Sequence, residues 1–205
     1  MIRCLVTDRH RLAGPTSSFD MQRDALREQF LRAVDDRIDL IQIRERDLAA
    51  ADLAAIVDAA VRASRGSSTR ILVNDRLDVA LACGADGVHL RSDSFAASRA
   101  RRITPPGFLI ARAVHTPDEA AAAGEVDYVI AGTVFSTVSK PGAIETVGVD
   151  GLEAIVGAAT APVLAIGGIT ADRFEEILRT GAAGVAGIGL FLPTALPFDS
   201  PGTSP

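Results

Sequence analysis

Residues 71–90 constrain the fold more than any other stretch, because ILVNDRLDVALACGADGVHL reads as one complete strand, helix and strand. Residues 71–73 form a continuous apolar run, which is typical of a strand buried on both faces. Gly84 is expected to end the helix, because the residue after a helix often needs left-handed backbone angles. Asn74 and Asp75 follow the first strand, at the carboxyl end where parallel sheets build their sites. This unit predicts a parallel sheet with polar groups at one edge.

The same alternation of strand and helix runs through the chain. Strands are predicted at residues 3–8, 40–44, 71–73, 88–90, 109–114, 128–133, 163–168 and 184–189. Eight such units in about 190 residues fit a compact (β/α)8 TIM barrel. An open doubly wound sheet is the structural alternative, and it would lack pairing between the first and last strands.

The end of the chain departs from the barrel pattern. After Phe191 it reads LPTALPFDSPGTSP, and its four prolines argue against a full last helix. We therefore expect one barrel domain over residues 1–191, with a truncated last helix, and a Pro-rich tail over residues 192–205. A missing helix would leave an apolar flank of the barrel, which a second copy in a homodimer would cover.

Several helix starts carry capping signals. Asp20 is predicted to cap the first long helix, after a loop over residues 10–18 that is rich in Gly, Pro and Ser. Thr116 and Glu119 have the spacing of a capping box, and the same spacing recurs from Asp150.

Composition limits the classes of partner. The net charge is −5 and only 4% of the residues are aromatic, which argues against a nucleic-acid partner. No apolar run approaches the length of a membrane span, and the N-terminus has no signal-peptide core. Cys4 and Cys83 lie in apolar surroundings and are expected to be buried free thiols. These features predict a soluble cytoplasmic protein.

Glycines at the ends of the last two predicted strands indicate an anion site. Gly168 and its neighbour Gly167 end one strand, and Ile188 with Gly189 ends the next. Glycine lets a phosphate approach backbone N–H groups closely, and barrels often bind phosphate at these two loops. The alternative is that the Gly-Gly pair only makes a tight turn.

Cationic side chains form a second group at the same rim. Arg44 lies at the end of an otherwise apolar strand, where a charge is costly unless it is paired or meets a ligand. Arg46 follows the same strand and Lys140 follows a later one, and such cations suit phosphate contacts. With the glycine site, they favour a substrate that carries more than one phosphate. The alternative is a structural ion pair of Arg44 with Glu45 or Asp75.

Two further rim residues have two interpretations each, and one strand residue has a single one. Asp75 is a candidate Mg²⁺ ligand, since Mg²⁺ takes one or two carboxylates plus substrate phosphates, or it is the N-cap of the following helix. His115 is a candidate proton-transfer group or satisfies backbone only. His89 lies within a strand and is interpreted as structural.

The sequence resembles those of the thiamine-phosphate synthase superfamily, which includes the thiazole tautomerases. The most specific segments are IQIRER, VNDRLDVALACGADGVHL, VHTPDEA, DYVIAGTVFSTVSK and LAIGGIT, and the resemblance covers nearly the whole chain. It implies a (β/α)8 barrel that uses Mg²⁺ to join a hydroxymethylpyrimidine diphosphate to a thiazole phosphate, with release of pyrophosphate through a pyrimidine cation.

The resemblance also implies roles for individual residues. The implied diphosphate contacts are Gln42, Arg44, Arg46, Asn74 and Lys140, of which Arg44, Asn74 and Lys140 are catalytic candidates. Thr137 and Ser139 correspond to a two-hydroxyl loop motif, and Asp75 to a Mg²⁺ ligand. Gly168, Ile188 and Gly189 would hold the thiazole phosphate.

The chain departs from the family pattern at several of these positions. Ser94 stands where synthases have a second Mg²⁺ carboxylate, with Asp93 one position early, and Gly189 stands where they have a serine. Tautomerases carry a catalytic histidine where this chain has Thr133, which leaves His115 as the nearby imidazole. A tautomerase-like isomerase and a non-catalytic binder of thiazole phosphate or thiamine phosphate are therefore the alternatives.

Overall fold

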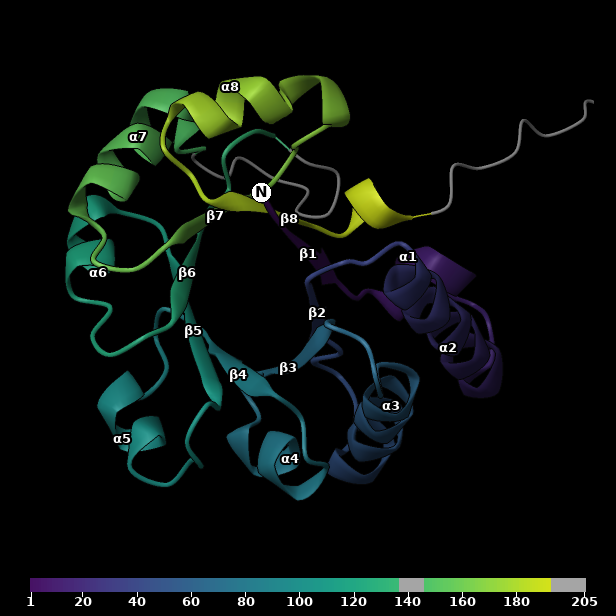
Figure 1. The fold of residues 1–205 in the computed structure, drawn as a ribbon. Helices are drawn as coiled ribbons and strands as arrows, with labels where there is room; N and C mark the ends of the chain where they lie inside the picture. Colours follow the sequence, from purple (N-terminus) through teal and green to yellow (C-terminus); the bar gives the residue numbers. More distant parts are fainter. Residues whose placement is uncertain (137–145, 193–205) are drawn as a thin grey trace, which may run out of the picture.

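A computed structural model describes residues 1–136 and 146–192, and it has the predicted closed parallel barrel (Figure 1). Each strand pairs in parallel with the next, and the last pairs with the first, which excludes the open sheet. The strands are β1 Ile2–Val6, β2 Leu40–Ile43, β3 Arg70–Asn74, β4 Gly87–Leu90, β5 Leu109–Val114, β6 Tyr128–Gly132, β7 Val163–Ile166 and β8 Gly184–Gly187.

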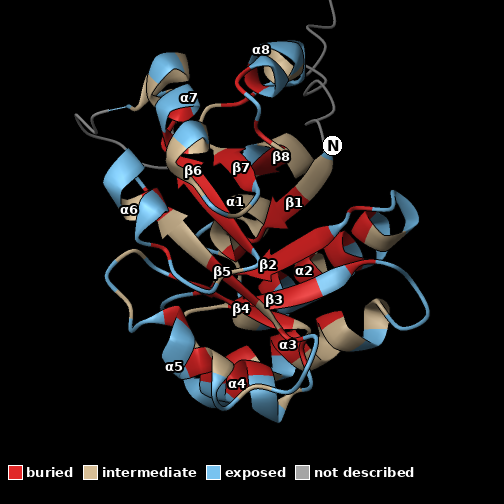
Figure 2. Cartoon of the chain, turned by 60° about the vertical axis from the view of Figure 1, so that its left-hand side comes forward, coloured by how far each residue is buried: buried red, intermediate tan, exposed pale blue. Residues whose placement is uncertain are grey.

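Helices form a ring outside the barrel (Figure 1), with their outer faces exposed and the strands buried (Figure 2). They are α1 Arg9–Ala13, α2 Phe19–Asp35, α3 Ala50–Ala63, α4 Leu77–Ala82, α5 Ala97–Arg101, α6 Pro117–Ala121, α7 Gly148–Ala158 and α8 Phe174–Arg179, with short 3-10 helices η1 Ala171–Arg173 and η2 Gly189–Phe191. Alternate strand residues serve two cores. Leu5 packs in the layer between the strands and the helices, whereas Cys4 and Val6 belong to the separate interior cluster.

The local predictions are partly wrong. The segment expected to be a loop contains α1, whose N-cap Asp8 accepts a hydrogen bond from the Arg11 backbone N–H at 3.1 Å. Ser18 caps α2, so Asp20 lies in its first turn instead. The Thr116 cap is confirmed, with its Oγ1 accepting from the Glu119 N–H at 3.1 Å.

Two further predictions, for Asp150 and Cys83, also need correction. Asp150 lies inside the first turn of α7, because that helix already begins at Gly148. Cys4 is a buried free thiol as predicted, but Cys83 is only half-buried, because it follows the last turn of the short α4.

The C-terminal expectations are tested only as far as Leu192. After β8 the described chain forms η2 alone, and the predicted tail from residue 193 onward lies outside the described residues. The division into a 1–191 barrel and a tail stays a prediction. Among the described helices, none has the length and apolar character that crossing a membrane requires.

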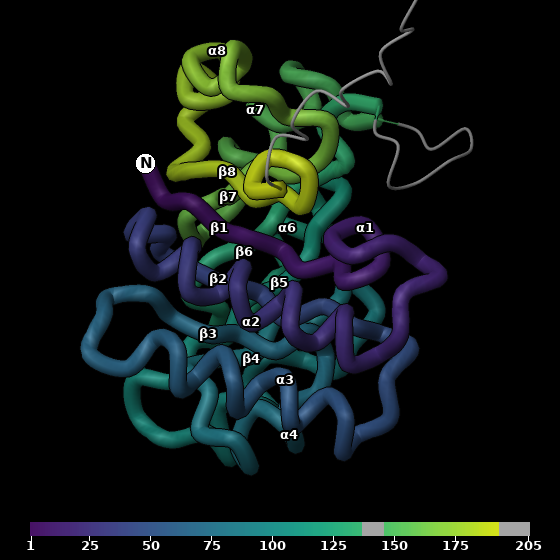
Figure 3. The backbone as a smooth tube through the Cα atoms, turned by 90° about the vertical axis from the view of Figure 1, so that its right-hand side faces the viewer, coloured from purple at the N-terminus to yellow at the C-terminus, as the bar shows by residue number. Residues whose placement is uncertain are grey.

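We expect Gly184→Ala to destabilise the barrel at its closure. Gly184 of β8 pairs with β1 (Figure 3), and a Cβ there would lie 2.0 Å from the Ile2 carbonyl oxygen. The strands must separate to admit it, so we expect urea unfolding to show a loss of about 3 kcal/mol. Gly157 in α7 is the matched control, with nothing within 4 Å of its Cβ position, and Gly157→Ala should raise stability by about 0.5–1 kcal/mol. Equal stability of the Gly184→Ala and wild-type proteins would contradict this.

Candidate active site

A cavity of about 990 Å³ opens at the carboxyl ends of the strands, and all eight strands or the loops after them line it. The predicted site residues that line it are Gln42, Arg44, Arg46, Asn74, Gly168, Ile188 and Gly189. Asp75 is not among the lining residues but follows directly on Asn74. Thr137, Ser139 and Lys140 lie outside the described residues.

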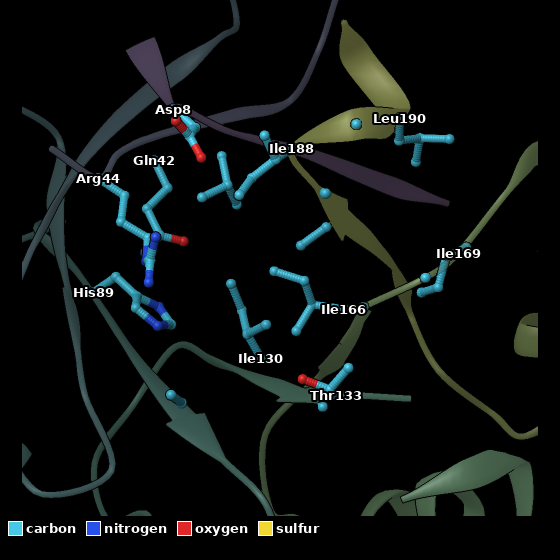
Figure 4. Close-up of a pocket in the computed structure, with 18 of the residues that line it drawn as sticks. Asp8, Gln42, Arg44, His89, Ile130, Thr133, Ile166, Ile169, Ile188 and Leu190 are labelled. Carbon is cyan, nitrogen blue, oxygen red and sulfur yellow. The ribbon is translucent and has the colours of Figure 1, made fainter. Parts of the chain in front are cut away.

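The cavity has a polar side and an apolar side. Figure 4 shows Asp8, Gln42, Arg44 and His89 together on one side. The other side carries Thr133 and the apolar side chains of Ile130, Ile166, Ile169, Ile188 and Leu190. This division suits a ligand pair in which one partner is highly charged and the other presents an apolar ring.

Arg44 is a half-buried cation at the polar side. Burial and, secondarily, the charge of Arg46 lower the pKa of its guanidinium. Within the described residues Arg44 makes no ion pair. Its two candidate partners pair with other residues there: Glu45 with Arg9 at 3.0 Å, and Asp75 with Arg91 at 3.9 Å. The interpretation of Arg44 as part of a structural ion pair is therefore wrong for this part of the chain. A half-buried guanidinium without an ion pair favours the binding of an anion.

Amide side chains continue the polar side next to Arg44. Gln42 of β2 donates from Nε2 to Oδ1 of Asn74 at the end of β3, at 3.0 Å. This bond orients both amides and leaves the Asn74 amino group to donate elsewhere. The two strands thereby present hydrogen-bond donors beside the guanidinium.

Asp75 follows β3 in a left-handed conformation, with φ 58°. Its Oδ1 accepts a hydrogen bond from the Ser94 hydroxyl. Asp75 is not the N-cap of α4, because Arg76 holds that position and makes no side-chain capping bond. Asp93 is exposed and pairs with Arg91. Within the described residues no cluster of three His, Cys, Asp or Glu side chains forms a metal site. Asp93 also lines the cavity but pairs with Arg91, so Asp75 is the carboxylate that we assign to a metal here.

The sequence predicts a structural role for His89, yet this residue lines the cavity with only 4% of its surface exposed. Burial, followed by the charges of Arg44 and Arg112, lowers the pKa of His89 from its ordinary value of 6.5 to about 3. Its Nδ1 has no hydrogen-bond partner within the described residues. His89 is therefore a neutral imidazole in the cavity wall, with a ring nitrogen that a ligand could satisfy.

This buried imidazole predicts an acid-sensitive stability. Between about pH 6.5 and pH 3 the unfolded chain binds a proton at His89 and the folded chain does not, so the free energy of unfolding falls as the pH falls. We expect His89→Gln to flatten that decline by up to about 1.4 kcal/mol per pH unit. Urea unfolding of both proteins at pH 7, 6, 5 and 4 measures it. Parallel curves for the two proteins would contradict it.

The loop after β7 needs glycine for steric reasons. Gly167 and Gly168 have φ angles of 106° and 61°, and Cβ atoms there would lie 2.5 Å from Thr133 Cγ2 and from the Ser136 carbonyl oxygen. The backbone conformation and the close packing therefore require glycine at both positions. Gly168 and Gly189 nevertheless both line the cavity, and neither has a side chain to block approach to the backbone.

The sequence interpretation missed the contribution of the loop after β1. Arg11 of α1 lines the cavity, although its segment was expected to be an irregular loop. Asp8 followed by a polar, helix-compatible run was the available signal, since Asp is a preferred N-cap. His115 also lines the cavity, and its Nδ1 hydrogen-bonds to the Gly132 carbonyl oxygen, so the backbone interpretation holds for that nitrogen.

Comparison with known proteins gives one consistent family. The model of the thiamine monophosphate synthase family matches residues 4–191. A thiamine-phosphate synthase of Roseiflexus castenholzii is 39% identical over 184 residues, covering 89% of this chain and 77% of that protein. One from Methanoculleus marisnigri is 43% identical over 150 residues, covering 72% and 71% respectively.

Solved structures give the same picture. A thiamine phosphate pyrophosphorylase from Pyrococcus furiosus superimposes with a TM-score of 0.75 at 32% identity, covering 92% of this chain and 85% of that one. A 3-hexulose-6-phosphate synthase superimposes with a TM-score of 0.64 at 15% identity, which is a likeness of fold alone.

Proposed function

This chain belongs to the thiamine monophosphate synthase family, and we propose that its cavity joins a hydroxymethylpyrimidine diphosphate to a thiazole phosphate with release of pyrophosphate. The observation that carries this proposal is the division of the cavity. A half-buried arginine that makes no ion pair within the described residues lies on one side, and glycines and apolar side chains lie on the other. One side suits a leaving diphosphate, and the other suits a ring that keeps its phosphate.

The diphosphate side is assigned to Gln42, Arg44, Arg46 and Asn74. Arg44 and Arg46 suit two anionic phosphate groups, because guanidinium groups bind phosphate oxygens in pairs. The Asn74 amide donates to a further oxygen. Thr137, Ser139 and Lys140 complete this set in the proposal and lie outside the described residues.

The reaction breaks the bond between the pyrimidine methylene carbon and the diphosphate oxygen. The bonding electrons leave with pyrophosphate, and the thiazole nitrogen then donates its lone pair to the methylene carbon of the pyrimidine cation. Arg44 and Arg46 stabilise the charge that develops on the departing diphosphate. His89 stays neutral at pH 7 and so places no positive charge beside the developing cation.

Mg²⁺ is the cofactor in this proposal, and Asp75 is its ligand from the chain. Mg²⁺ is commonly held by one or two carboxylates together with substrate phosphates, which fits a site to which we assign one carboxylate. When bound, it would neutralise charge on the leaving diphosphate. Ser94 orients the Asp75 carboxylate through its hydroxyl.

Assay of the full-length protein tests the function. With Mg²⁺ and both substrates, we expect thiamine phosphate and pyrophosphate to form in equal amounts. Absence of both products would refute the synthase. Isomerisation of a thiazole carboxylate phosphate alone would then indicate the isomerase, and binding without turnover would indicate the non-catalytic binder.

We also propose that the chain acts as a homodimer in the cytoplasm. The sequence after Phe191 carries four prolines, which argue against a full last helix over that part of the barrel. A second copy would cover that part. Sedimentation velocity of the full chain distinguishes the dimer from a monomer, which would contradict this assignment.

A further inference from the structure

The loop between β4 and α5 contacts the Asp75 carboxylate, which we assign to the metal. The Ser94 hydroxyl donates to Oδ1 of Asp75, and the Arg91 backbone nitrogen lies 3.5 Å from the same oxygen. The Arg91 guanidinium lies 3.9 Å from Oδ2. The direction in which Asp75 presents its oxygens therefore depends on where this loop lies.

Hydrophobic packing contributes little to the position of this loop. None of residues 91–96 is buried, and their one large apolar side chain, Phe95, is 39% exposed. Within the loop, the Ser94 N–H donates to the Arg91 carbonyl oxygen at 3.2 Å, which is a local bond that does not attach the loop to the barrel. The attachment must therefore come from polar contacts.

Arg112 of β5 makes polar contacts of this kind. Its Nη1 donates to the Ser92 carbonyl oxygen at 3.1 Å. Its Nη2 donates to the carbonyl oxygens of Ser94, at 3.4 Å, and of Phe95. Arg112 pairs with Leu90, the last residue of β4, so its side chain starts next to the point where the loop leaves the barrel. One guanidinium thus holds three carbonyl groups of the loop.

A charge at this position needs an explanation. The other residues of β5 are all apolar, namely Leu109, Ile110, Ala111, Ala113 and Val114. Arg112 is half-buried, and it makes no ion pair in the part of the chain that the structure describes. Because a half-buried charge is costly without polar partners, the loop carbonyls are what compensate it. Arg112 is not among the residues that line the cavity, so it acts on the site through the loop.

We propose that Arg112 is a positioning residue for the metal site. By holding the loop after β4, it keeps the Ser94 hydroxyl on Asp75 and thereby sets how strongly the diphosphate site depends on Mg²⁺. This assignment rests on the proposed function and deepens it. Groups that orient a metal ligand in this way change metal affinity by about 10- to 100-fold.

Calorimetric titration of the full-length protein with the pyrimidine diphosphate, with and without Mg²⁺, tests the proposal. For Arg112→Gln we expect the Kd with Mg²⁺ to rise about tenfold, because the loop no longer holds Ser94 against Asp75. The Kd without Mg²⁺ and the Kd of thiazole phosphate should each change less than about twofold. A general loss of stability would not confine the effect to the titration with Mg²⁺.

Arg3→Gln is the matched control. Arg3 of β1 is also a half-buried strand arginine, and its Nη2 donates to the carbonyl oxygens of Asp36 and Arg37 at 2.9 Å and 2.6 Å. It is not among the residues that line the cavity. Arg3→Gln should lower the midpoint of thermal unfolding, as Arg112→Gln does, and leave the Kd of the diphosphate unchanged with and without Mg²⁺.

A double variant shows whether Arg112 acts through Ser94. Ser94→Ala alone should raise the Kd with Mg²⁺ about tenfold. If the two residues act in series, the double variant of Arg112→Gln and Ser94→Ala should also lose about tenfold, whereas independent effects would multiply to about 100-fold. If Arg112→Gln does not fold, Arg112→Lys takes its place, because lysine keeps the charge but reaches fewer of the three carbonyls. We then expect a smaller loss that is again confined to Mg²⁺.

The outcomes separate this proposal from the proposed function. If wild-type protein makes thiamine phosphate but the Arg112 variant keeps its Kd with Mg²⁺, the role of Arg112 is wrong and the synthase stands. Equal weakening with and without Mg²⁺, or a 100-fold loss in the double variant, would also overturn that role. Wild-type protein that makes thiamine phosphate without any dependence on Mg²⁺ overturns the metal roles of Asp75 and Arg112 alone. Wild-type protein that makes no product refutes the proposed function itself.

Discussion

Arg44→Gln should lower kcat/KM for the pyrimidine diphosphate about 1,000-fold, because two charge-assisted hydrogen bonds to the leaving group are lost in the transition state. The same substitution should raise the free energy of unfolding by about 1 kcal/mol, because Arg44 is a half-buried cation that makes no ion pair within the described residues. Its lowered pKa has the same cause. Loss of activity with gain of stability is the signature of a charge kept for a ligand.

Urea unfolding and steady-state kinetics on the same preparation measure both quantities. Arg27→Gln, on the exposed face of α2, is the matched control and should leave both unchanged. A structural ion pair would give the opposite sign for stability, since removing one partner of a pair leaves the other uncompensated. A less stable Arg44→Gln variant with normal kcat/KM would therefore overturn the assignment.

The barrel could be predicted because its signals are local. Residues 109–114 and 77–82 form β5 and α4 over the stretches expected from apolar runs and a terminating Gly84, whose φ is 66°. Segment type and order depend on such short patterns. Eight buried strands in sequence leave few topologies other than a closed barrel.

The orientation of side chains in the barrel could not be predicted in the same way. All four residues of β4 are buried, because one face meets the helices and the other the barrel interior. Hydrophobic periodicity therefore does not distinguish the two faces of β4, and it does not predict that the His89 side chain faces the cavity. A polar residue in a strand buried on both sides deserves an inward-facing interpretation as well as a structural one.

Long-range partners were equally out of reach. Arg11 lies beside Gly189, which is near the other end of the chain, and Arg9 pairs with Glu45 in the loop after β2. Such contacts depend on the closure between β1 and β8 and on the register of β1 against β2. The spacing of residues in the sequence predicts neither the barrel closure nor this register. The rim residues could be grouped because the carboxyl ends of parallel strands share one edge, but not arranged within that edge.

Asp75→Asn should remove the Mg²⁺ dependence of pyrimidine diphosphate binding and lower kcat/KM about 1,000-fold, because the carboxylate assigned to the ion is lost. The fold should be unaffected. Asn adopts the left-handed conformation of this position as readily as Asp, and its Oδ1 can still accept from Ser94. Calorimetric titration of the diphosphate with and without Mg²⁺ gives a readout that does not depend on turnover.

Ser94→Ala is the matched control for Asp75→Asn. It removes the hydrogen bond to Asp75 and keeps the carboxylate, so Mg²⁺-dependent binding should weaken only about tenfold. If Asp75→Asn still binds the diphosphate more tightly with Mg²⁺, the ion is held elsewhere and Asp75 is not its ligand. If even the wild type is indifferent to Mg²⁺, one carboxylate is too few. The arginines would then have to neutralise the leaving diphosphate without a metal, and Arg44→Gln would be the more damaging of the two variants.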